Sequence, residues 1–429
     1  MRKDIDLRIP VLGPPTVDSP LGLSTVANDH VADYTPDDAA VALDLSGRDG
    51  GGRFERAGAR QKLYFEGSRT YAGIVTCGGL CPGMNNVVRG LVMQLWHAYG
   101  VRRIFGFQYG FLGLTPGGPP PLELTPDLVR DIHLQGGTRL GSSRGPQSPA
   151  AMADTLERLK VDILFCVGGD GTLRGALALH EELQRRGRKV GVIGVPKTID
   201  NDVPYIERTF GFETAVAEAT RAITAAHVEA CGAPNGVGIV RLMGRHSGFI
   251  AASATLASGE VNLCLVPELP FHLEGPRGVL ALLRERLRRR GHAVVVVAEG
   301  AGQDLVAAGG AKDASGNVKL GDIGVFLRDT VAREFRDLDV NVKYIDPSYI
   351  IRAAPANPAD AIFCGVLAEN AVHAAMAGKT AMVVGLWGGL FTHVPLVAAT
   401  SGRNTISTDS AFWRSVVEST GQPPLLVNP

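Results

Sequence analysis

The sequence predicts an α/β fold with mostly parallel sheets, and three observations favour it. Short apolar runs recur along the chain, and most of them end in a glycine-rich loop. Segments with helical character, several rich in alanine and leucine, follow these loops. The chain also carries 54 glycines in 429 residues, against an average usage of roughly 7%. Strand, glycine loop and helix in alternation are typical of βαβ units, in which ligands bind at the carboxyl ends of the strands.

The expected elements follow in a regular order. Residues 1–69 hold five prolines and little hydrophobic periodicity, so we expect an extension that wraps the core or stays partly loose. The first strand begins at Tyr71 and runs into the glycines of AGIVTCGG. In Pro276–Arg290 leucines alternate with arginines, which indicates a solvated helix rather than a nucleic-acid surface. Further strands are expected at Val161–Val167, Val190–Val195, Val237–Leu242, His292–Ala298 and Ala381–Leu386.

Composition excludes several classes of protein. The 43 basic and 43 acidic residues balance to a net charge of zero, which argues against a nucleic-acid or membrane partner. No apolar stretch reaches the roughly 18 residues that span a bilayer, and the N-terminus lacks a signal-peptide pattern. Six scattered cysteines suggest no disulfide framework, and Cys77 and Cys81 lack a second pair at zinc spacing. We therefore expect a soluble, cytoplasmic protein of two or three domains.

The strongest motif is Gly168-Gly169-Asp170-Gly171-Thr172, which lies between a buried strand and a helix. Glycines let backbone N–H groups face an anion, and the helix N-terminus adds a positive dipole. Asp170 would place a carboxylate beside bound phosphates, where Mg²⁺ is commonly held. A tight turn without ligand is the alternative. The Walker pattern GxxxxGK[ST] is missing from the sequence, so a P-loop enzyme is not expected.

Four further segments point to phosphate chemistry. Residues 78–86 form a second glycine loop opening a helix, although a plain turn would look similar. In residues 196–202, Asp200 and Asp202 follow a buried strand, where one carboxylate can accept a hydroxyl proton while the other orients it; an Asx-rich turn is the alternative. Residues 140–144 and 243–248 each place an arginine among small residues, which suits a phosphoryl group; a surface salt bridge is the alternative for each. Together these features predict a Mg²⁺-dependent kinase with an aspartate base.

At this point the chain resembles the phosphofructokinases. The strings GGDGT, PKTIDND, MGRHSGFIA, VPELPFHLEG and DPSYIIRA occur in the order of that family, over about residues 71–424. Local strings such as IVTCGGLCPGMN are similar to the longer ATP-dependent branch that is related to pyrophosphate enzymes. The resemblance implies two Rossmann-like lobes with the active site in the cleft between them. It assigns residues 70–211 and about 352–429 to a nucleotide lobe, and 212–351 to a sugar-phosphate lobe.

The resemblance also implies an activity, which is transfer of the γ-phosphoryl group of ATP to the C1 hydroxyl of fructose 6-phosphate, the committed step of glycolysis. Asp200 would be the base that takes the hydroxyl proton, and Thr198 and Asp202 would hold the sugar and the base in place. Arg245 would counter charge on the transferring group. Mg²⁺ would be held by Asp170.

Binding residues are implied in the same way. The ATP phosphates would be lined by Gly78, Arg144, Gly168, Gly169, Gly171, Thr172, Gly175 and Lys197. The sugar would contact Met243, Gly244 and Glu268, and its 6-phosphate would contact Tyr349 and Arg352. Lys343 would join the 6-phosphate from a neighbouring subunit, which implies a homodimer or homotetramer.

Two residues point to different phosphoryl donors. Gly171 leaves room for the α-phosphate of ATP, whereas pyrophosphate enzymes of the family tend to carry aspartate there. Lys197 is shared with the pyrophosphate enzymes. The longer ATP-dependent branch combines both features, so ATP is the expected donor and pyrophosphate the alternative.

The chain departs from the short bacterial pattern at Gly236, where an arginine is usual, and at Tyr349, where histidine is usual. We therefore transfer no effector-binding residue. NAD kinases and lipid kinases also carry GGDGT but not the other strings. A regulatory subunit without activity would be expected to lose Asp170 or Asp200, and both are present.

Overall fold

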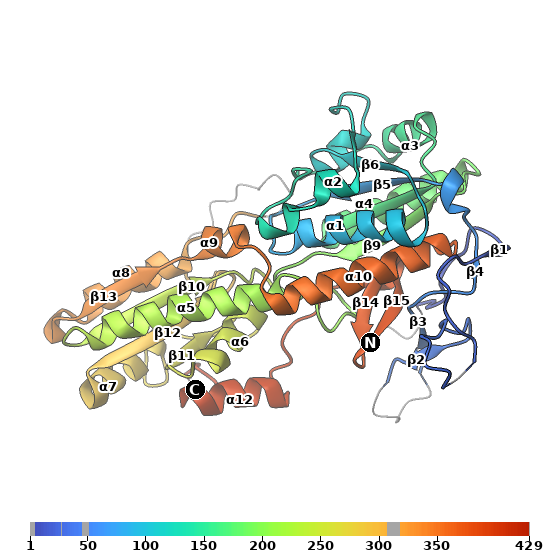
Figure 1. The fold of residues 1–429 in the computed structure, drawn as a ribbon. Helices are drawn as coiled ribbons and strands as arrows, with labels where there is room; N and C mark the ends of the chain where they lie inside the picture. The colour runs from blue at the N-terminus through green and yellow to red at the C-terminus, as the bar shows by residue number, and fades with distance from the viewer. Residues whose placement is uncertain (1–4, 27, 45–50, 307–317, 429) are drawn as a thin grey trace. The chain divides into compact units, whose positions relative to one another are not determined.

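The computed structural model describes residues 5–26, 28–44, 51–306 and 318–428. The chain divides into two compact units (Figure 1). Unit 1 comprises residues 1–198, 203–211 and 353–403, and unit 2 comprises residues 199–202, 212–352 and 404–429. The chain passes between the units after residues 198, 202, 211, 352 and 403. The crossings at 211 and 352 match the expected boundaries, but residues 199–202, expected in the nucleotide lobe, belong to unit 2.

Unit 1 contains a nine-stranded sheet in the order β2-β3-β15-β14-β9-β8-β5-β6-β7. The five central strands, from β14 to β6, run parallel, and the flanking strands pair antiparallel. The bounds are β2 Ala40–Ala42, β3 Arg53–Arg56, β5 Tyr71–Thr76, β6 Arg103–Phe107, β7 Leu122–Glu123, β8 Ile163–Gly168, β9 Gly191–Pro196, β14 Met382–Trp387 and β15 Leu390–Pro395. A parallel centre brings the carboxyl ends of β5, β8 and β9 to one edge, which is where glycine loops follow.

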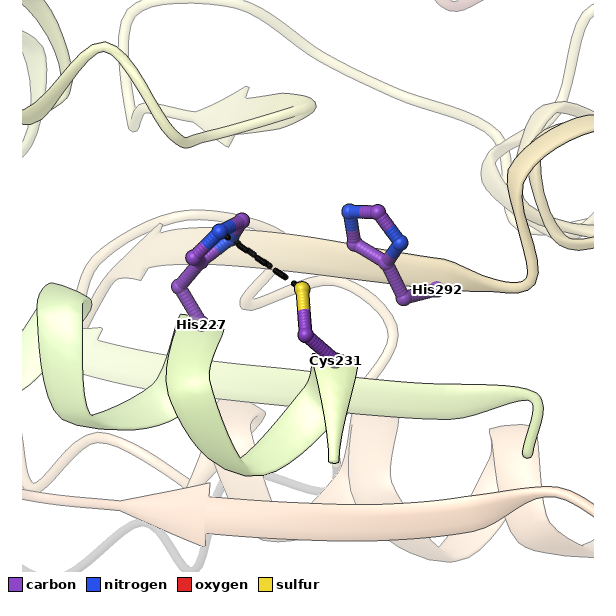
Figure 2. Close-up of side chains that lie close together, drawn as sticks. All are labelled: His227, Cys231 and His292. Carbon is purple, nitrogen blue, oxygen red and sulfur yellow. Dashed lines mark hydrogen bonds between the residues drawn. The ribbon is translucent and has the colours of Figure 1, made fainter. Parts of the chain in front are cut away.

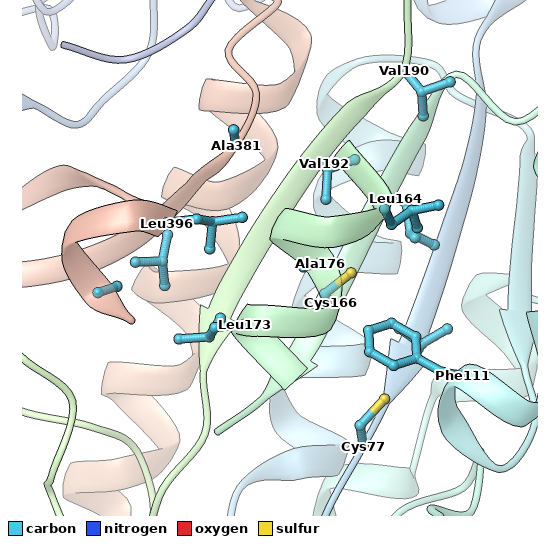
Figure 3. Packing of buried hydrophobic residues seen from close by; sticks show 14 of the residues in the cluster. Cys77, Phe111, Leu164, Cys166, Leu173, Ala176, Val190, Val192, Ala381 and Leu396 are labelled. Carbon is cyan, nitrogen blue, oxygen red and sulfur yellow. The ribbon is translucent and has the colours of Figure 1, made fainter. Parts of the chain in front are cut away.

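Helices cover this sheet, and its core is apolar. The helices are α1 Met84–Met93, α2 Pro126–Val129, α3 Pro149–Arg158, α4 Asp170–Arg185, α10 Pro358–Met376 and α11 Leu396–Ala399, with single turns η1 Gly67–Arg69, η3 Gly110–Leu114 and η4 Ile132–Leu134, and a π-helical segment η2 Gln94–Ala98. Leu164 and Cys166 of β8 pack with Leu173 of α4 and Leu396 of α11 (Figure 3). Every one of these four side chains is fully buried, so the β8–α4 turn rests on a close-packed base.

The N-terminal extension contributes to unit 1. Its strands β2 and β3 add to the sheet edge beside β15. Strands β1 Val17–Asp18 and β4 Lys62–Leu63 form a separate antiparallel pair. Phe54 and Leu63 are fully buried, which explains why the segment is ordered despite its prolines.

Unit 2 contains a four-stranded parallel sheet in the order β11-β12-β10-β13. The strands are β10 Gly236–Leu242, β11 Leu263–Leu265, β12 His292–Ala298 and β13 Asn341–Ile345. Helices α5 Phe212–Cys231, α6 Phe249–Ser258 and α12 Ala411–Thr420 pack on one face, and α7 Val279–Arg290 and α8 Ile323–Glu334 on the other. Shorter elements are η5 Arg336–Leu338 and α9 Ser348–Ala353. Within the described parts of the chain, no helix is both long and apolar enough to cross a membrane.

The C-terminal segment differs from the expected lobe assignment. All residues after about 352 were expected in the nucleotide lobe. Residues 404–429 instead belong to unit 2, because Ile406, Trp413 and Val416 are buried against α5 and α6 in its core. A core of this kind joins residues far apart in sequence, so the motif order did not reveal it. The six strands expected from the sequence all form, and each starts and ends within two residues of its expected bounds.

Candidate active site

The first glycine loop of unit 1 follows β5, at the carboxyl edge of the sheet. Gly78 adopts a φ of +84°, a conformation that favours glycine. Its N–H donates to the carbonyl oxygen of Ser143 at 3.1 Å, and the Ser142 hydroxyl donates to the Gly78 carbonyl at 2.6 Å. The structure thus joins residues 78–86 to residues 140–144, two segments that the sequence analysis had singled out separately.

Two cationic side chains approach this loop. The Lys197 ammonium donates to the Gly79 carbonyl at 2.7 Å, and the Lys197 side chain is almost fully buried. A Cβ atom on Gly79 would lie 3.2 Å from a guanidinium nitrogen of Arg144, and one on Gly78 would lie 3.2 Å from the Lys197 ammonium. The two glycines therefore let the cations approach the backbone closely. Two positive side chains at a glycine loop on the carboxyl edge of the sheet are suited to binding phosphate oxygens.

The turn between β8 and α4 lies beside Lys197, whose N–H donates to the Gly168 carbonyl at 3.0 Å. A Cβ atom on Gly168 would collide with the Thr172 side chain, so this glycine is required by packing. At Gly171 an added Cβ would meet no atom within 4 Å. The turn therefore presents open space at Gly171, at the N-terminus of a 16-residue helix.

Gly175 has a different environment from the other glycines assigned to phosphate binding. It lies in the next turn of α4, and a Cβ atom there would come within 2.6 Å of the Phe111 ring. Close packing against this ring is sufficient to explain glycine at the position. Its assignment to the phosphate site stays a prediction.

Asp170 starts α4 and pairs with two arginines. Its carboxylate accepts from the Arg174 guanidinium at 2.8 Å, and Arg403 lies 3.7 Å away. The spacing of Asp170 and Arg174, four residues apart on a helix, was readable from the sequence. The approach of Arg403 was not, since that residue lies far along the chain, at the last residue of unit 1. Sequence reasoning missed both partners.

The nearby thiol of Cys77 is not a nucleophile in this arrangement. Burial raises the pKa of Cys77 to about 12, and the neighbouring charge of Lys197 only partly opposes that shift. Because the thiolate is the reactive form, Cys77 is a packing residue at the base of the loop.

In unit 2, Asp200 and Asp202 are held by their backbone. The Ser247 hydroxyl donates to the Asp200 carbonyl at 3.1 Å, and the N–H of Asn404 donates to the Asp202 carbonyl at 2.9 Å. Between them, Asn201 adopts a left-handed φ of +55°. The loop conformation is therefore set by main-chain contacts, and it places Asp200 beside the loop that carries Arg245.

The loop of residues 243–248 follows β10 and is fixed by Glu268. The N–H of Gly248 donates to both Glu268 carboxylate oxygens, at 2.9 and 3.1 Å, and the N–H of Ile406 donates to one of them at 2.9 Å. Gly244 has a φ of +128°, which only glycine adopts readily. The sequence analysis assigned Glu268 to the sugar, whereas here its carboxylate joins the loop to the C-terminal segment. A carboxylate can accept further hydrogen bonds, so the two roles are compatible.

The remaining residues assigned to the sugar also lie in unit 2. The Arg352 guanidinium donates to the sulfur of Met243 at 3.2 Å, so α9 approaches the loop after β10. Arg245 donates to the Val318 carbonyl. Lys343 is exposed on β13, and Tyr349 is 84% exposed. Side chains exposed to this degree contribute little to the packing of their own unit.

Comparison with known proteins shows the family of this chain. Residues 71–375, which are most of the chain, match the sequence profile of the family described as Phosphofructokinase. The chain belongs to the phosphofructokinase family. Three relatives named ATP-dependent 6-phosphofructokinase support this family assignment. That of Amycolatopsis methanolica is 53% identical over 86% of this chain and 83% of its own length. That of Borreliella burgdorferi is 48% identical over 87% and 86%. That of Trypanosoma brucei brucei is 50% identical over 85% and 76%.

Solved structures of the family share the fold. A pyrophosphate-dependent phosphofructokinase from Marinobacter aquaeolei has a TM-score of 0.69 and 20% identity, and the match covers 82% of this chain and 91% of the other. The phosphofructokinase of Saccharomyces cerevisiae has a TM-score of 0.64 and 23% identity, over 82% and 48%. At these identities the comparisons support the fold alone. The expected family and α/β fold are confirmed.

One charged cluster of this family member was missed by sequence reasoning. Arg241, on β10, is 15% exposed and pairs with Asp346 at 2.7 Å, Glu299 at 3.0 Å and Asp322 at 3.7 Å. Asp346 also accepts from the N–H of Ser348 at 3.0 Å and from its hydroxyl, at the start of α9. Burial raises the pKa of Asp346, but these hydrogen bonds and Arg241 outweigh it and leave the pKa below its usual value. The cluster fixes the start of the helix that carries Tyr349 and Arg352. An arginine in an otherwise apolar strand was the available signal.

The role of Glu268 in holding the loop gives a prediction for stability. We expect Glu268→Ala to lower the free energy of unfolding by about 2 kcal/mol, because it leaves two backbone N–H groups without their acceptor. Urea denaturation followed by circular dichroism measures it. Glu274→Ala, at an exposed position of the same unit, serves as control and should change stability by less than about 0.5 kcal/mol. An equally small change in Glu268→Ala would contradict the structural role.

Proposed function

We propose that the protein transfers the γ-phosphoryl group of ATP to the C1 hydroxyl of fructose 6-phosphate, giving fructose 1,6-bisphosphate and ADP. The observation that carries the proposal is the convergence of Lys197 and Arg144 on the glycine loop at residues 78–79, beside open space at Gly171. Cations, backbone N–H groups and room for an α-phosphate are the requirements of a nucleotide triphosphate site. The relatives' names support the same donor and acceptor.

Mg²⁺ belongs to this proposal, and Asp170 is the residue assigned to hold it. Proteins usually bind Mg²⁺ through one or two carboxylates together with the phosphates of the substrate. Asp170 fits that donor set, because its side chain is 22% exposed and stands at the N-terminus of α4. Arg174 and Arg403 would keep the carboxylate oriented. Bound Mg²⁺ would neutralise phosphate charge during transfer.

At the sugar end, Asp200 would accept the proton of the C1 hydroxyl, and Arg245 would counter charge on the transferring group. Only two residues separate Lys197 from Asp200, so chain length alone limits the distance between their Cα atoms to about 11 Å. A phosphate-binding cation and a base therefore stay close together. Thr198 and Asp202 would position the base and the sugar.

The assay that tests the function uses purified protein, fructose 6-phosphate and Mg²⁺, with fructose 1,6-bisphosphate formation coupled to a dehydrogenase. ATP and pyrophosphate are compared as donors. Turnover with ATP alone is the expected result. Turnover with pyrophosphate alone would mean that Lys197 outweighs Gly171 in donor choice. Turnover with neither would leave the proposal without support.

We also propose that the enzyme is a homo-oligomer whose sugar sites use Lys343 from a neighbouring subunit. The exposure of Lys343 and Tyr349 supports the proposal. Co-expression of differently tagged Lys343→Ala and Asp200→Asn chains tests it, with each variant alone as control. If Lys343 acts across the interface, mixed oligomers isolated through both tags regain about half of wild-type activity, because one of the two sites in each mixed pair receives both intact residues. If Lys343 acts within its own chain, mixing restores nothing.

A further inference from the structure

A cluster of three metal-ligating side chains lies in unit 2, apart from the residues assigned to catalysis (Figure 2). His227 and Cys231 stand four residues apart in the last turns of α5, so they share one helix face. His292 is the first residue of β12 and faces them from the neighbouring strand. Their ligand atoms all lie within 4.8 Å of one another.

The distance between the ligand atoms of Cys231 and His227 matches that of a zinc site. Zinc binds thiolate at about 2.3 Å and imidazole nitrogen at about 2.1 Å, so a tetrahedral angle separates the two ligand atoms by about 3.6 Å. The Cys231 sulfur lies 3.5 Å from Nε2 of His227. The rings of His227 and His292 are centred 5.5 Å apart and nearly perpendicular, so they approach the sulfur from different directions. Little side-chain movement is needed to bring the three ligands around one ion.

The groups around the three side chains favour metal binding. Nδ1 of His292 lies 3.1 Å from the Arg290 carbonyl, and the tautomer that donates this hydrogen bond leaves Nε2 as a ligand. Cys231 ends α5, where the negative end of the helix dipole favours a cation. Arg286 donates to the His292 carbonyl at 3.3 Å and so holds the start of β12, although its charge opposes a nearby cation.

We propose that His227, Cys231 and His292 bind a thiophilic divalent cation, best fitted by Zn²⁺, with water or an external ligand in the fourth position. Two nitrogens and one thiolate select zinc over Mg²⁺, which prefers oxygen ligands. Cys231 is exposed, so ions can exchange with solvent and the thiol is accessible when no ion is bound.

The cluster is distinct from the catalytic residues of unit 2. His292 pairs with Gly236 at the amino-terminal edge of the parallel sheet, whereas the loop of residues 243–248 follows the carboxyl end of β10. Six residues of extended strand separate the two edges, a length of about 20 Å. Metal at the cluster would therefore not contact the substrate residues of this unit.

Cobalt spectroscopy tests the proposal on the full-length protein. After treatment with a chelator, the protein is titrated with Co²⁺. We expect a thiolate-to-cobalt charge-transfer band in the near ultraviolet, intense tetrahedral d–d bands in the visible, and loss of both on addition of Zn²⁺. Cys231→Ala should lose the charge-transfer band, and His227→Gln and His292→Ala should each weaken the d–d bands. His97→Ala, at an exposed histidine outside the cluster, should keep the full spectrum.

Two results would overturn the assignment. A wild-type protein without the charge-transfer band would mean that Cys231 and His227 form only a thiol–imidazole hydrogen bond. A band that persists in Cys231→Ala would place the metal on another cysteine. Phosphotransferase activity with Mg²⁺, measured on the same samples, serves as the folding control and should be unchanged in all four variants.

Discussion

Replacement of Asp200 by asparagine should lower kcat by about 10²–10⁴, the usual contribution of a positioned general base. Asparagine keeps the shape of the side chain but cannot accept the proton of the C1 hydroxyl. The Asp200 backbone is held through its carbonyl by Ser247, so the loop does not depend on the carboxylate for that contact. Binding of ATP and fructose 6-phosphate should therefore change little, and the loss should fall on turnover.

Steady-state kinetics and calorimetric titration of both substrates separate these effects. Asp304→Asn, which removes an exposed carboxylate of the same unit, is the matched control and should retain wild-type turnover. Thermal unfolding of both variants checks that the fold is intact. Near-normal turnover in Asp200→Asn would remove Asp200 as the base, and weakened sugar binding with normal turnover would make it a binding residue only.

Replacement of Gly171 by aspartate should lower kcat/KM for ATP by about a hundredfold or more. A carboxylate about 5 Å from a phosphate charge costs about 3 kcal/mol at an effective dielectric constant of about 20. That energy corresponds to about two orders of magnitude in rate. Because an added Cβ at Gly171 would meet no atom within 4 Å, the protein itself should tolerate the change. An acidic residue in the first turn of α4 also interacts favourably with the helix dipole.

Two further variants separate the effect of charge from the effect of side-chain volume at position 171. Gly171→Asn has nearly the shape of aspartate without its charge, and Gly171→Ala adds only a methyl group. We expect activity with ATP to fall in the order alanine, asparagine, aspartate, while assays with pyrophosphate show whether the aspartate variant gains that donor. Equal ATP kinetics in wild type and Gly171→Asp would show that residue 171 does not face the nucleotide, and the donor argument would fail.

Local pattern was enough to predict the fold class because strands, turns and helix starts depend on neighbouring residues. The β8–α4 turn at residues 168–172 is an example. Its glycines predict a strand-to-helix turn, whatever the position of the strand in the sheet. The structure places this turn at the carboxyl edge. The roles of Asp200, Arg245 and the binding residues stay predictions, since their test is kinetic.

Contacts between segments that lie far apart in the chain could not be predicted from the sequence. Glu268 joins the loop at Gly248 to Ile406, which lies 138 residues beyond Glu268. Arg403 approaches Asp170 across more than a hundred residues. His227 and Cys231 have a visible helical spacing, but the third member of their cluster comes from the start of a later strand.

The sequence by itself determined the alternation of strands and helices, the glycine turns, the carboxylates that follow the strands, and the family. Only the tertiary structure decided which cations reach the first glycine loop, which carboxylate holds the second loop, that residues 404–429 pack with unit 2, and that a histidine joins His227 and Cys231. The physical reason is the distance along the chain over which each interaction acts. Backbone propensity acts over a few residues, whereas hydrogen bonds, ion pairs and metal ligands require atoms that only the packed core brings together.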